Sequence, residues 1–473
     1  MKLFPIYTWN KGIRNFNHRR SMLSNLPWMQ GVILLACVVV AMLLANLPFT
    51  KDFYHNLLET DISLYFKGPD GTNLLFPDGM TVEKFINDIL MTVFFFTVGL
   101  EIRREVKSGE LSTVRKALMP VIAAAGGVMV PALIFFCINR GTAAATGWGI
   151  PTATDIAFAV GILSILGDRV PVSLKVFLTA LAVADDLFAI IVVALFYGGQ
   201  INFHLLGLAV VMIVFVLLLN RLGEKRGWFF FIPAMIIWAL FYYSGIHATM
   251  SGVVMAFLVP MKPRYSEAYF QRKSRQYIRR IREYESIESS SGGFPNGPQR
   301  HCLRRLAAIS NGSIGMTYRL EHILTPWVNF LIMPLFALAN AGVEIADPSY
   351  FKVLHFDPVL GGVGMGVFLG LLIGKPVGIT LASFLAVKLK AGEMPSKASW
   401  KMLAAVACLG GIGFTMSIFV DTLSFSDQAP EITSRLRDMG KVAVLMGSLC
   451  SGIFGSLLVS LVHRIESRKQ ASA

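Results

Sequence analysis

The chain has 473 residues, of which 54% are hydrophobic and 15% are charged, and its mean hydropathy is +0.60. This balance excludes an ordinary soluble globular protein and indicates a membrane protein. The net charge of +14 does not indicate nucleic-acid binding, because the basic residues are concentrated in alternate loops between apolar stretches.

Twelve stretches of the chain are apolar enough to cross a bilayer as helices, each of which needs about 20 residues. They do not show the ten-residue alternation of apolar and polar positions that is typical of a transmembrane barrel. We therefore predict an all-α integral membrane protein with twelve transmembrane helices in a single polytopic domain, residues 1–473. The predicted spans are 28–47, 83–106, 116–138, 150–166, 171–198, 203–220, 228–244, 246–260, 327–343, 359–387, 400–424 and 439–462.

The loops alternate in charge along the chain. Basic residues precede the first span and fill the loops after spans two, six and ten, whereas the loop after span one is acidic. The positive-inside rule then predicts that both termini are cytoplasmic, which requires an even number of spans. The first span lacks an A-x-A cleavage site, so we expect an uncleaved helix rather than a signal peptide.

The loop after the first span contains two strand-like runs around a Pro-Asp-Gly turn, at residues 61–76. This pattern predicts a hairpin on the outer face. An isolated hairpin is only marginally stable in water. The segment therefore either pairs with a second copy across a homodimer interface or is simply a loop.

Two predicted spans, the fourth and the eleventh, are interrupted at their centres. Pro151, two threonines and an aspartate interrupt IPTATDIAFAVG, and three glycines interrupt LGGIGFTMSIF: Gly410, Gly411 and Gly413. Interrupted helices at matching places in two halves of a chain are typical of the central ion site of a transporter.

Each interrupted span is the second in a group of three. The groups cover residues of about 115–198 and 357–464 and form two repeat-like halves. Because three helices reverse the membrane orientation, we predict inverted repeats of three helices with the two interrupted helices crossing at the ion site.

Span five carries Asp185 and Asp186 side by side in an otherwise apolar stretch. On an insertion scale a central aspartate costs roughly 2.5–3.5 kcal/mol, so two of them cancel most of what the apolar neighbours contribute. Asp186 shares one helix face with Thr179, Ala182 and Ala189, and we expect this face to lie inside the bundle. Asp185 points about 100° away and can therefore contact a different partner.

The loop between spans eight and nine is strongly basic, and residues 263–318 form an insert within it. Within the insert, Tyr277, Ile281, Tyr284 and Glu288 recur at helical spacing with arginines on the other faces. Two interpretations are open: a basic amphipathic helix that lies on anionic lipid, or a solvated cytoplasmic insert without a role in transport.

Span ten places Lys375 in the middle of GLLIGKPVGITLAS, on a helix whose glycines recur every four residues and predict a close-packing face: Gly370, Gly374 and Gly378. A buried lysine needs an anion, so we predict an ion pair with an aspartate of span five. Such a pair could merely fix helix register. One lysine, however, cannot neutralise Asp155, Asp185 and Asp186 together, and the excess of carboxylates favours a bound cation.

An unwound break in a helix exposes an N-terminus with partial positive charge and a C-terminus with partial negative charge. We expect Asp155 to lie at the N-termini, where it can also act as an N-cap, and Lys375 at the C-termini.

Five segments together resemble the NhaA-type sodium/proton antiporters of bacterial inner membranes: PTATDIAFAVGIL, ALAVADDLFAII, GLLIGKPVGI, SGIHATMSG and GIGFTMSIF. They occur in the same order and at similar spacing, and the match runs from about residue 28 to 460 apart from the loop near 263–318. This family is itself a known example of inverted repeats, so the repeat arrangement is also what the resemblance implies.

The resemblance implies a secondary active antiporter rather than an enzyme, with sodium or lithium and protons as substrates and no cofactor. It implies that Asp186 binds sodium and carries protons, that Asp185 is its essential neighbour and pairs with Lys375, and that Thr154 and Asp155 belong to the crossed-chain assembly. A carboxylate binds either a small hard cation or a proton, so competition for one site would couple the two fluxes. Two protons for one sodium would make the exchange electrogenic, with the second proton on Asp185 or Lys375.

Several residues match positions that resemble the pH-sensing cluster of the family: Glu101, Arg104, Glu105, Arg319, Glu321 and His322. The first three also fit an ordinary salt-bridge set at a helix end. His247 either tunes the pH response or satisfies a turn. The sequence departs from the family at Thr325, where a second histidine often follows, and this departure leaves the active pH range open.

Other functional classes have less support. The GxGD signature of intramembrane aspartyl proteases, a Walker loop and an H-E-x-x-H zinc motif are all missing from the sequence. A cation channel stays open as an alternative, because charged residues that line a pore would look similar in a sequence.

Overall fold

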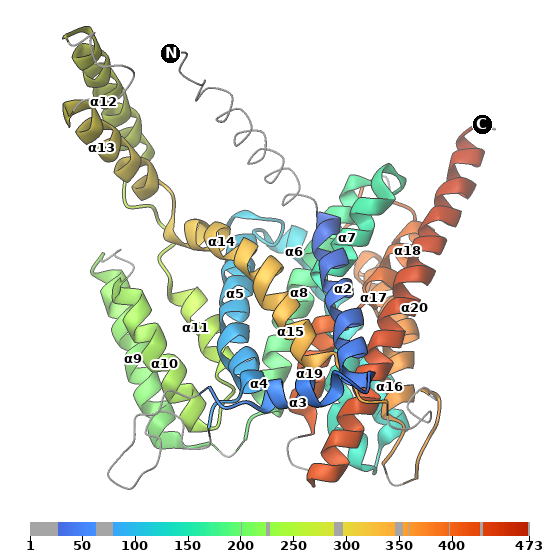
Figure 1. Cartoon of the computed structure of the whole chain (residues 1–473). Coiled ribbons are helices and arrows are strands. Elements are labelled where there is room, and N and C mark those ends of the chain that lie inside the picture. The colour runs from blue at the N-terminus through green and yellow to red at the C-terminus, as the bar shows by residue number, and fades with distance from the viewer. Residues whose placement is uncertain are drawn as a thin grey trace, which may run out of the picture.

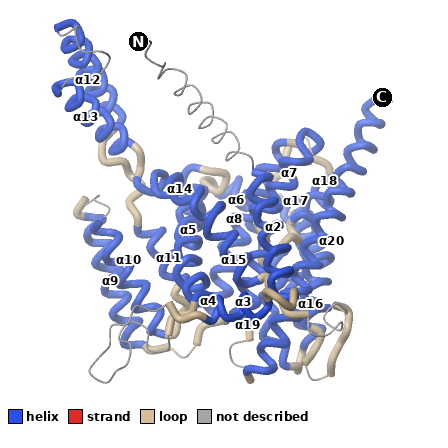
Figure 2. The backbone as a smooth tube through the Cα atoms, viewed as in Figure 1, coloured by secondary structure: helices blue, strands red, loops and turns tan. Residues whose placement is uncertain are grey.

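The computed structural model describes residues 27–62, 79–199, 201–223, 228–287, 297–345, 353–358, 360–396, 398–425 and 429–471. Within these ranges the chain is helical, with isolated β-bridges but no strand. Figure 2 shows the helices as one bundle whose loops gather at its two ends. This arrangement suits a bilayer, because a helix satisfies its backbone hydrogen bonds internally.

Eight helical stretches among the described residues are long and apolar enough to cross a membrane, or ten if two bent helix pairs each count as one span. Two further predicted spans correspond to α10 (Trp228–Ser244) and α11 (Thr249–Leu258), which have 17 and 10 residues. A helix of ten residues is about 15 Å long and does not cross the hydrocarbon alone. The multi-pass helical fold is confirmed, whereas the count of twelve stays a prediction.

The other long helices agree with the predicted spans. They are α2 (Pro27–Asn46), α5 (Met91–Ser108) with the preceding α4 (Val82–Lys84) and η1 (Phe85–Leu90), α6 (Val114–Asn139), α8 (Val172–Phe196), α9 (Phe203–Arg221), α14 (Met316–Trp327) continued by η4 (Val328–Ile332) and α15 (Met333–Asn340), α16 (Val363–Leu369) continued by η6 (Gly370–Gly374) and α17 (Lys375–Lys388), and α20 (Pro430–Ala471).

The bundle has two distinct ends in Figure 1. One end carries α3 (Lys51–Glu59) and α4, and the opposite end carries α12 (Glu267–Ile287) and α13 (Gly297–Ser313), which project from it. We call these ends the α3 face and the insert face. Helix α20 begins at the α3 face and ends at the insert face.

Both predicted interruptions are present. The 3₁₀-helix η2 (Ala143–Thr152) and α7 (Ile156–Leu166, extended by η3, Gly167–Arg169) are bent by 40° at their break. Helices α18 (Trp400–Leu409) and α19 (Phe414–Ser424) are bent by 54°. Pro151 lies within η2, and the three predicted glycines lie at or beside the second break. The relation of the two halves as inverted repeats stays a prediction.

The glycines of span ten allow the close packing that the sequence predicts. A Cβ atom placed on Gly378 would lie 2.2 Å from the carbonyl oxygen of Gly126 in α6, and one on Gly370 would lie 2.7 Å from Pro151. Side chains at these positions would push α16 and α17 away from α6 and η2. Close contact here holds the middle of span ten, and therefore Lys375, against the first break.

The basic insert forms two helices rather than one. On α12 the residues Tyr277, Ile281 and Tyr284 are half-buried, whereas its arginines are exposed, so the amphipathic helix is present and its contact with lipid stays a prediction. Helix α13 packs along α12, which indicates that the half-buried stripe faces α13. Glu288 lies outside the described residues.

The predicted hairpin at 61–76 lies almost entirely outside the described residues. At its base, Asp61 pairs with Thr81 in an isolated antiparallel bridge, and the Asp61 carboxylate accepts a hydrogen bond from the Met80 amide at 3.1 Å. The pairing of two hairpins in a dimer stays a prediction.

Candidate ion-binding site at the crossing of two broken helices

The two breaks are joined by hydrogen bonds between segments more than 250 residues apart. The Asp155 amide donates to the Ile412 carbonyl at 2.6 Å, and the Thr154 hydroxyl donates to the Gly410 carbonyl at 2.8 Å. Both carbonyls belong to the break after α18, where helical partners are missing. The first break therefore supplies the donors that the second break needs, inside the bundle where water is scarce.

Asp155 lies at the N-termini of two helices at once. It is the N-cap of α7, where its carboxylate accepts from the Phe158 amide at 3.2 Å. The same carboxylate accepts from the Thr415 amide at 3.3 Å and from the Thr415 hydroxyl at 2.5 Å, at the start of α19. Each helix N-terminus carries partial positive charge, so this position stabilises a buried anion. The expected placement of Asp155 is therefore present.

Lys375 is fully buried at the start of α17. Its ammonium group forms an ion pair with Asp185 Oδ2 and donates a hydrogen bond to the Thr154 hydroxyl at 2.8 Å. The expected contact with an aspartate of span five is thus present, and Asp185 is the partner. Lys375 contacts a hydroxyl of the first break rather than the free carbonyls of a helix end, because Thr154 and Asp155 already occupy the carbonyls of Gly410 and Ile412.

Asp185 and Asp186 are both buried, at 0% and 2% exposure. Among the described residues, Asp185 Oδ1 and Asp186 Oδ1 have no hydrogen-bond partner. The charges that act on Asp186 come from Asp185, Glu101, Asp155 and Lys375, three of them acidic. Oxygen atoms in this situation are expensive to bury unless a proton or a cation neutralises them.

The residues expected to sense pH separate into two places. Arg104 at the end of α5 forms ion pairs with Glu105 at 2.9 Å and with Glu321 of α14 at 3.0 Å. The charges of Arg104, Glu105 and Glu321 also act on Glu101, which therefore lies between this group and Asp186 in electrostatic terms. These residues are therefore more than a salt-bridge set at the end of one helix, because the ion pairs of Arg104 join α5 to α14.

The remaining candidates form none of these ion pairs, although the charge of His322 acts on Glu321. His322 is exposed and its ring stacks on Tyr318 with centroids 6.3 Å apart, and Arg319 donates to the Asn311 carbonyl at 3.4 Å. His247 is hydrogen-bonded through Nε2 to the carbonyl oxygen of Tyr197, in the loop between α10 and α11. This contact joins the loop to the end of α8, and a role of His247 in the pH response stays a prediction.

Sequence reasoning missed two residues near the crossing. Thr415 supplies two hydrogen bonds to Asp155, and Asp421 is a fully buried carboxylate further along α19. A signal for Asp421 was available, because an aspartate within an apolar span is unusual in itself.

The chain is similar in sequence to known sodium/proton antiporters. Residues 22–459 match the profile of the family described as Na+/H+ antiporter 1. The chain is 38% identical over 466 residues to the Na(+)/H(+) antiporter NhaA of Wolinella succinogenes, with 98% of this chain and 96% of the relative covered. It is 41% identical over 441 residues to the Na(+)/H(+) antiporter NhaA of Helicobacter pylori (strain P12), with 93% and 94% covered. The protein of the same name from Oleidesulfovibrio alaskensis is 39% identical over 434 residues, with 92% of each chain covered.

Proposed function

The chain belongs to the Na+/H+ antiporter 1 family, and we propose that it is a secondary active transporter that exchanges cytoplasmic sodium for external protons across a bacterial inner membrane. It is a transporter and not an enzyme, and sodium and protons are its substrates. Membership of an antiporter family favours this function over the cation channel that the sequence alone left open.

One observation carries the mechanism: two adjacent buried carboxylates each keep an oxygen without a hydrogen-bond partner among the described residues. Lys375 neutralises Asp185, so Asp186 is the carboxylate with the greater need for a counter-charge. A proton or a sodium ion meets that need, but not both at once. Competition between them at Asp186, with Asp185 as second ligand, couples the two fluxes without any covalent chemistry.

The crossing supplies the rest of the site. Thr154 holds the Lys375 ammonium group and the second break together, and Asp155 fixes the N-termini of α7 and α19. Exchange of two protons for one sodium moves net charge, so the membrane potential drives sodium outward. The second proton comes from Asp185 or Lys375, which share one ion pair. Lithium, a smaller hard cation, is a second substrate of the same site.

The remaining proposals concern orientation, regulation and partners. The insert face is cytoplasmic, together with both termini, and the α3 face is external. Glu101, Arg104, Glu105 and Glu321 form a pH-responsive group near the cytoplasmic end of α5, with His322 beside it. The 263–318 insert contacts anionic lipid through its exposed arginines. The 61–76 segment contributes to a homodimer.

Sodium-induced collapse of a pH gradient in everted membrane vesicles tests the proposed exchange and its site. Wild-type vesicles should show the collapse, and Asp186→Asn should abolish it, because an amide cannot carry the proton or neutralise the cation. Asp168→Asn makes the same change on an exposed residue and should behave as the wild type. Exchange that is unchanged in Asp186→Asn would refute the site, and sodium flux without opposing protons would indicate a channel.

A further inference from the structure

A fourth buried aspartate of the described residues lies outside the proposed sodium site. Asp421 in α19 has 0% exposure, and within the described part of the chain neither of its carboxylate oxygens has a hydrogen-bond partner. It lies six residues beyond Thr415, which is about 9 Å along the helix at 1.5 Å per residue. Helix α19 runs from the crossing toward the α3 face (Figure 1), and Asp421, in its last turn, therefore lies on that side of the sodium site.

A carboxylate in this position cannot be explained by packing alone. A charged group without partners in the membrane interior costs several kcal/mol, and an ionisable residue there is by default a candidate for function. Because neither carboxylate oxygen of Asp421 has a partner among the described residues, this environment favours its neutral, protonated form. Ser417 lies one helical turn nearer to the crossing, and its buried hydroxyl also lacks a partner among the described residues. Polar atoms that can accept or pass a proton therefore continue along this part of α19.

Helix α20 presents the charges that could stabilise the deprotonated form. Arg437, Lys441 and Asp438 all act electrostatically on Asp421, and the Tyr197 phenol at the end of α8 lies within range of it. The backbone of α20 comes very close, because a Cβ atom on Gly440 would lie 2.0 Å from Asp421 Oδ1. Arg437 Nε is itself buried without a hydrogen-bond partner in the described ranges. Arg437 therefore acts electrostatically on Asp421 but forms no ion pair with it.

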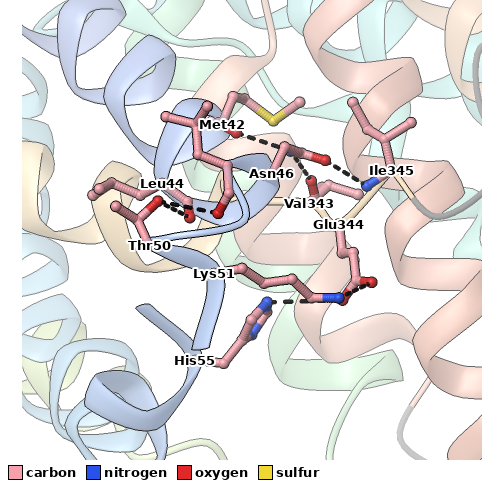
Figure 3. A network of polar contacts seen from close by, with 10 residues as sticks. Met42, Leu44, Asn46, Thr50, Lys51, His55, Val343, Glu344 and Ile345 are labelled. Carbon is pink, nitrogen blue, oxygen red and sulfur yellow. Dashed lines mark hydrogen bonds and ion pairs between the residues drawn. The ribbon is translucent and has the colours of Figure 1, made fainter. Parts of the chain in front are cut away.

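A series of titratable groups leads from this position to the surface of the α3 face. The charges of Glu344 and His55 act on Asp438. Figure 3 shows where these two residues lie: Glu344 forms an ion pair with Lys51 of α3, and His55 Nε2 is 4.0 Å from Glu344 Oε2. Their side chains are 39–40% exposed, so they reach water, although His55 Nε2 is itself buried without a hydrogen-bond partner among the described residues.

Hydrogen bonds hold this surface group in place. Asn46 at the end of α2 donates to the Val343 carbonyl at 2.8 Å and accepts from the Ile345 amide at 2.8 Å, which fixes the segment that carries Glu344 (Figure 3). The titratable series therefore begins on a fixed part of the surface and ends at Asp421.

We propose that Asp421 is a second proton-carrying carboxylate, which takes up protons from the side of the α3 face and delivers them toward the sodium site. The inference rests on the proposed antiport. A proton from external water enters at His55 and Glu344, passes by Asp438 and neutralises Asp421. When Asp421 releases this proton toward the crossing, Arg437 and Lys441 stabilise the carboxylate that remains. Proton transfer along α19 would thereby join the external medium to the site where protons and sodium compete.

The test compares sodium efflux from right-side-out membrane vesicles at several external pH values and a fixed internal pH. In the wild type, efflux should accelerate as the external pH falls. Asp421→Asn should lose most of this acceleration yet keep the stabilisation by sodium that a thermal-shift measurement on the purified full chain reports. Asp52→Asn changes an exposed carboxylate of the same face and should match the wild type in both measurements.

A second variant keeps the inference testable if Asp421→Asn folds poorly. Arg437→Gln removes a charge that stabilises the deprotonated acid, so the midpoint of the response to external pH should move to higher pH. A wild-type response to external pH in both variants would overturn the inference while leaving the antiport intact. Absence of sodium/proton exchange in the wild type would overturn the proposed function, and the role of Asp421 with it.

Discussion

The two broken spans meet at one point but contribute different groups to it. The break between η2 and α7 contributes side chains, since Thr154 and Asp155 both bond across the crossing. The break between α18 and α19 contributes mainly backbone, namely the carbonyls of Gly410 and Ile412 and the amide of Thr415. The two predicted repeat halves thus contribute differently. The first break provides the charged side chain, and the second break provides backbone groups close enough to bond to it.

This division predicts that the first break depends on charge and the second on space. Lys375 lies beside the first break and pairs with Asp185 across to α8. Gly411 lies in the second break, where a Cβ atom would be 2.3 Å from the carbonyl oxygen of Leu371. Substitutions at these two residues should therefore fail for different physical reasons.

Lys375→Ala should produce the largest loss of stability. It leaves the Asp185 carboxylate buried without its counter-charge, which typically lowers the free energy of unfolding by about 3–5 kcal/mol. Thermal melting of the purified chain in detergent measures the effect, and Lys388→Ala at the exposed end of α17 is the matched control. Adding Asp185→Asn to Lys375→Ala should restore much of the stability, because the orphaned charge is then removed.

A melting temperature of Lys375→Ala equal to that of the wild type would contradict the charge-dependent first break. Transport should be lost in both the single and the double variant, since each removes the ion pair of Asp185 and Lys375. Recovery of stability without recovery of transport would separate the structural contribution of the ion pair from its role at the site.

Gly411→Ala should have the next largest effect, and it tests the second break. The added methyl group meets the backbone of η6 at Leu371, which cannot give way easily, as well as the Ser451 hydroxyl at 2.8 Å. Overpacking of this kind typically costs about 1–3 kcal/mol. Gly410→Ala is the control, since its nearest contact is the flexible end of Ile379 at 2.8 Å. Equal melting temperatures of Gly411→Ala and Gly410→Ala would show that the second break does not depend on close approach of the backbone.

Much of this arrangement could be predicted from the sequence, because its causes are local. Proline and threonine in one span and glycines in another disfavour a continuous helix, so both breaks were predictable at their observed places. The local pattern did not decide between Asp185 and Asp186 as the partner of Lys375, and only the family resemblance implied Asp185. The two carboxylates differ only by 100° around α8, and the rotation of α8 and α17 against each other decides between them.

Other features depend on contacts that no local pattern records. Asp421 is visible in the sequence as an acid within an apolar span, but its burial against Gly440 follows from the register of α20. The double role of Asp155 as cap of α7 and acceptor at α19 needs two segments 260 residues apart to meet. The same limit applies to α11, whose ten helical residues are fewer than the apolar stretch that predicts it.

Arg104→Gln should have the smallest effect on stability, because Arg104 lies outside both breaks. Its side chain is 36% exposed, and ion pairs of this kind contribute about 0.2–1 kcal/mol.

Transport by Arg104→Gln should respond more than its stability. Loss of the cation leaves Glu321 without its counter-charge, so this acid holds its proton to a higher pH and the pH profile of exchange should move in the alkaline direction. Everted vesicles report this profile, and Arg319→Gln is the control, since Arg319 bonds to the Asn311 carbonyl instead. If Arg104→Gln leaves the pH profile of exchange unchanged, the contact between α5 and α14 only packs two helices together. The ion-dependent chemistry is then confined to the crossing.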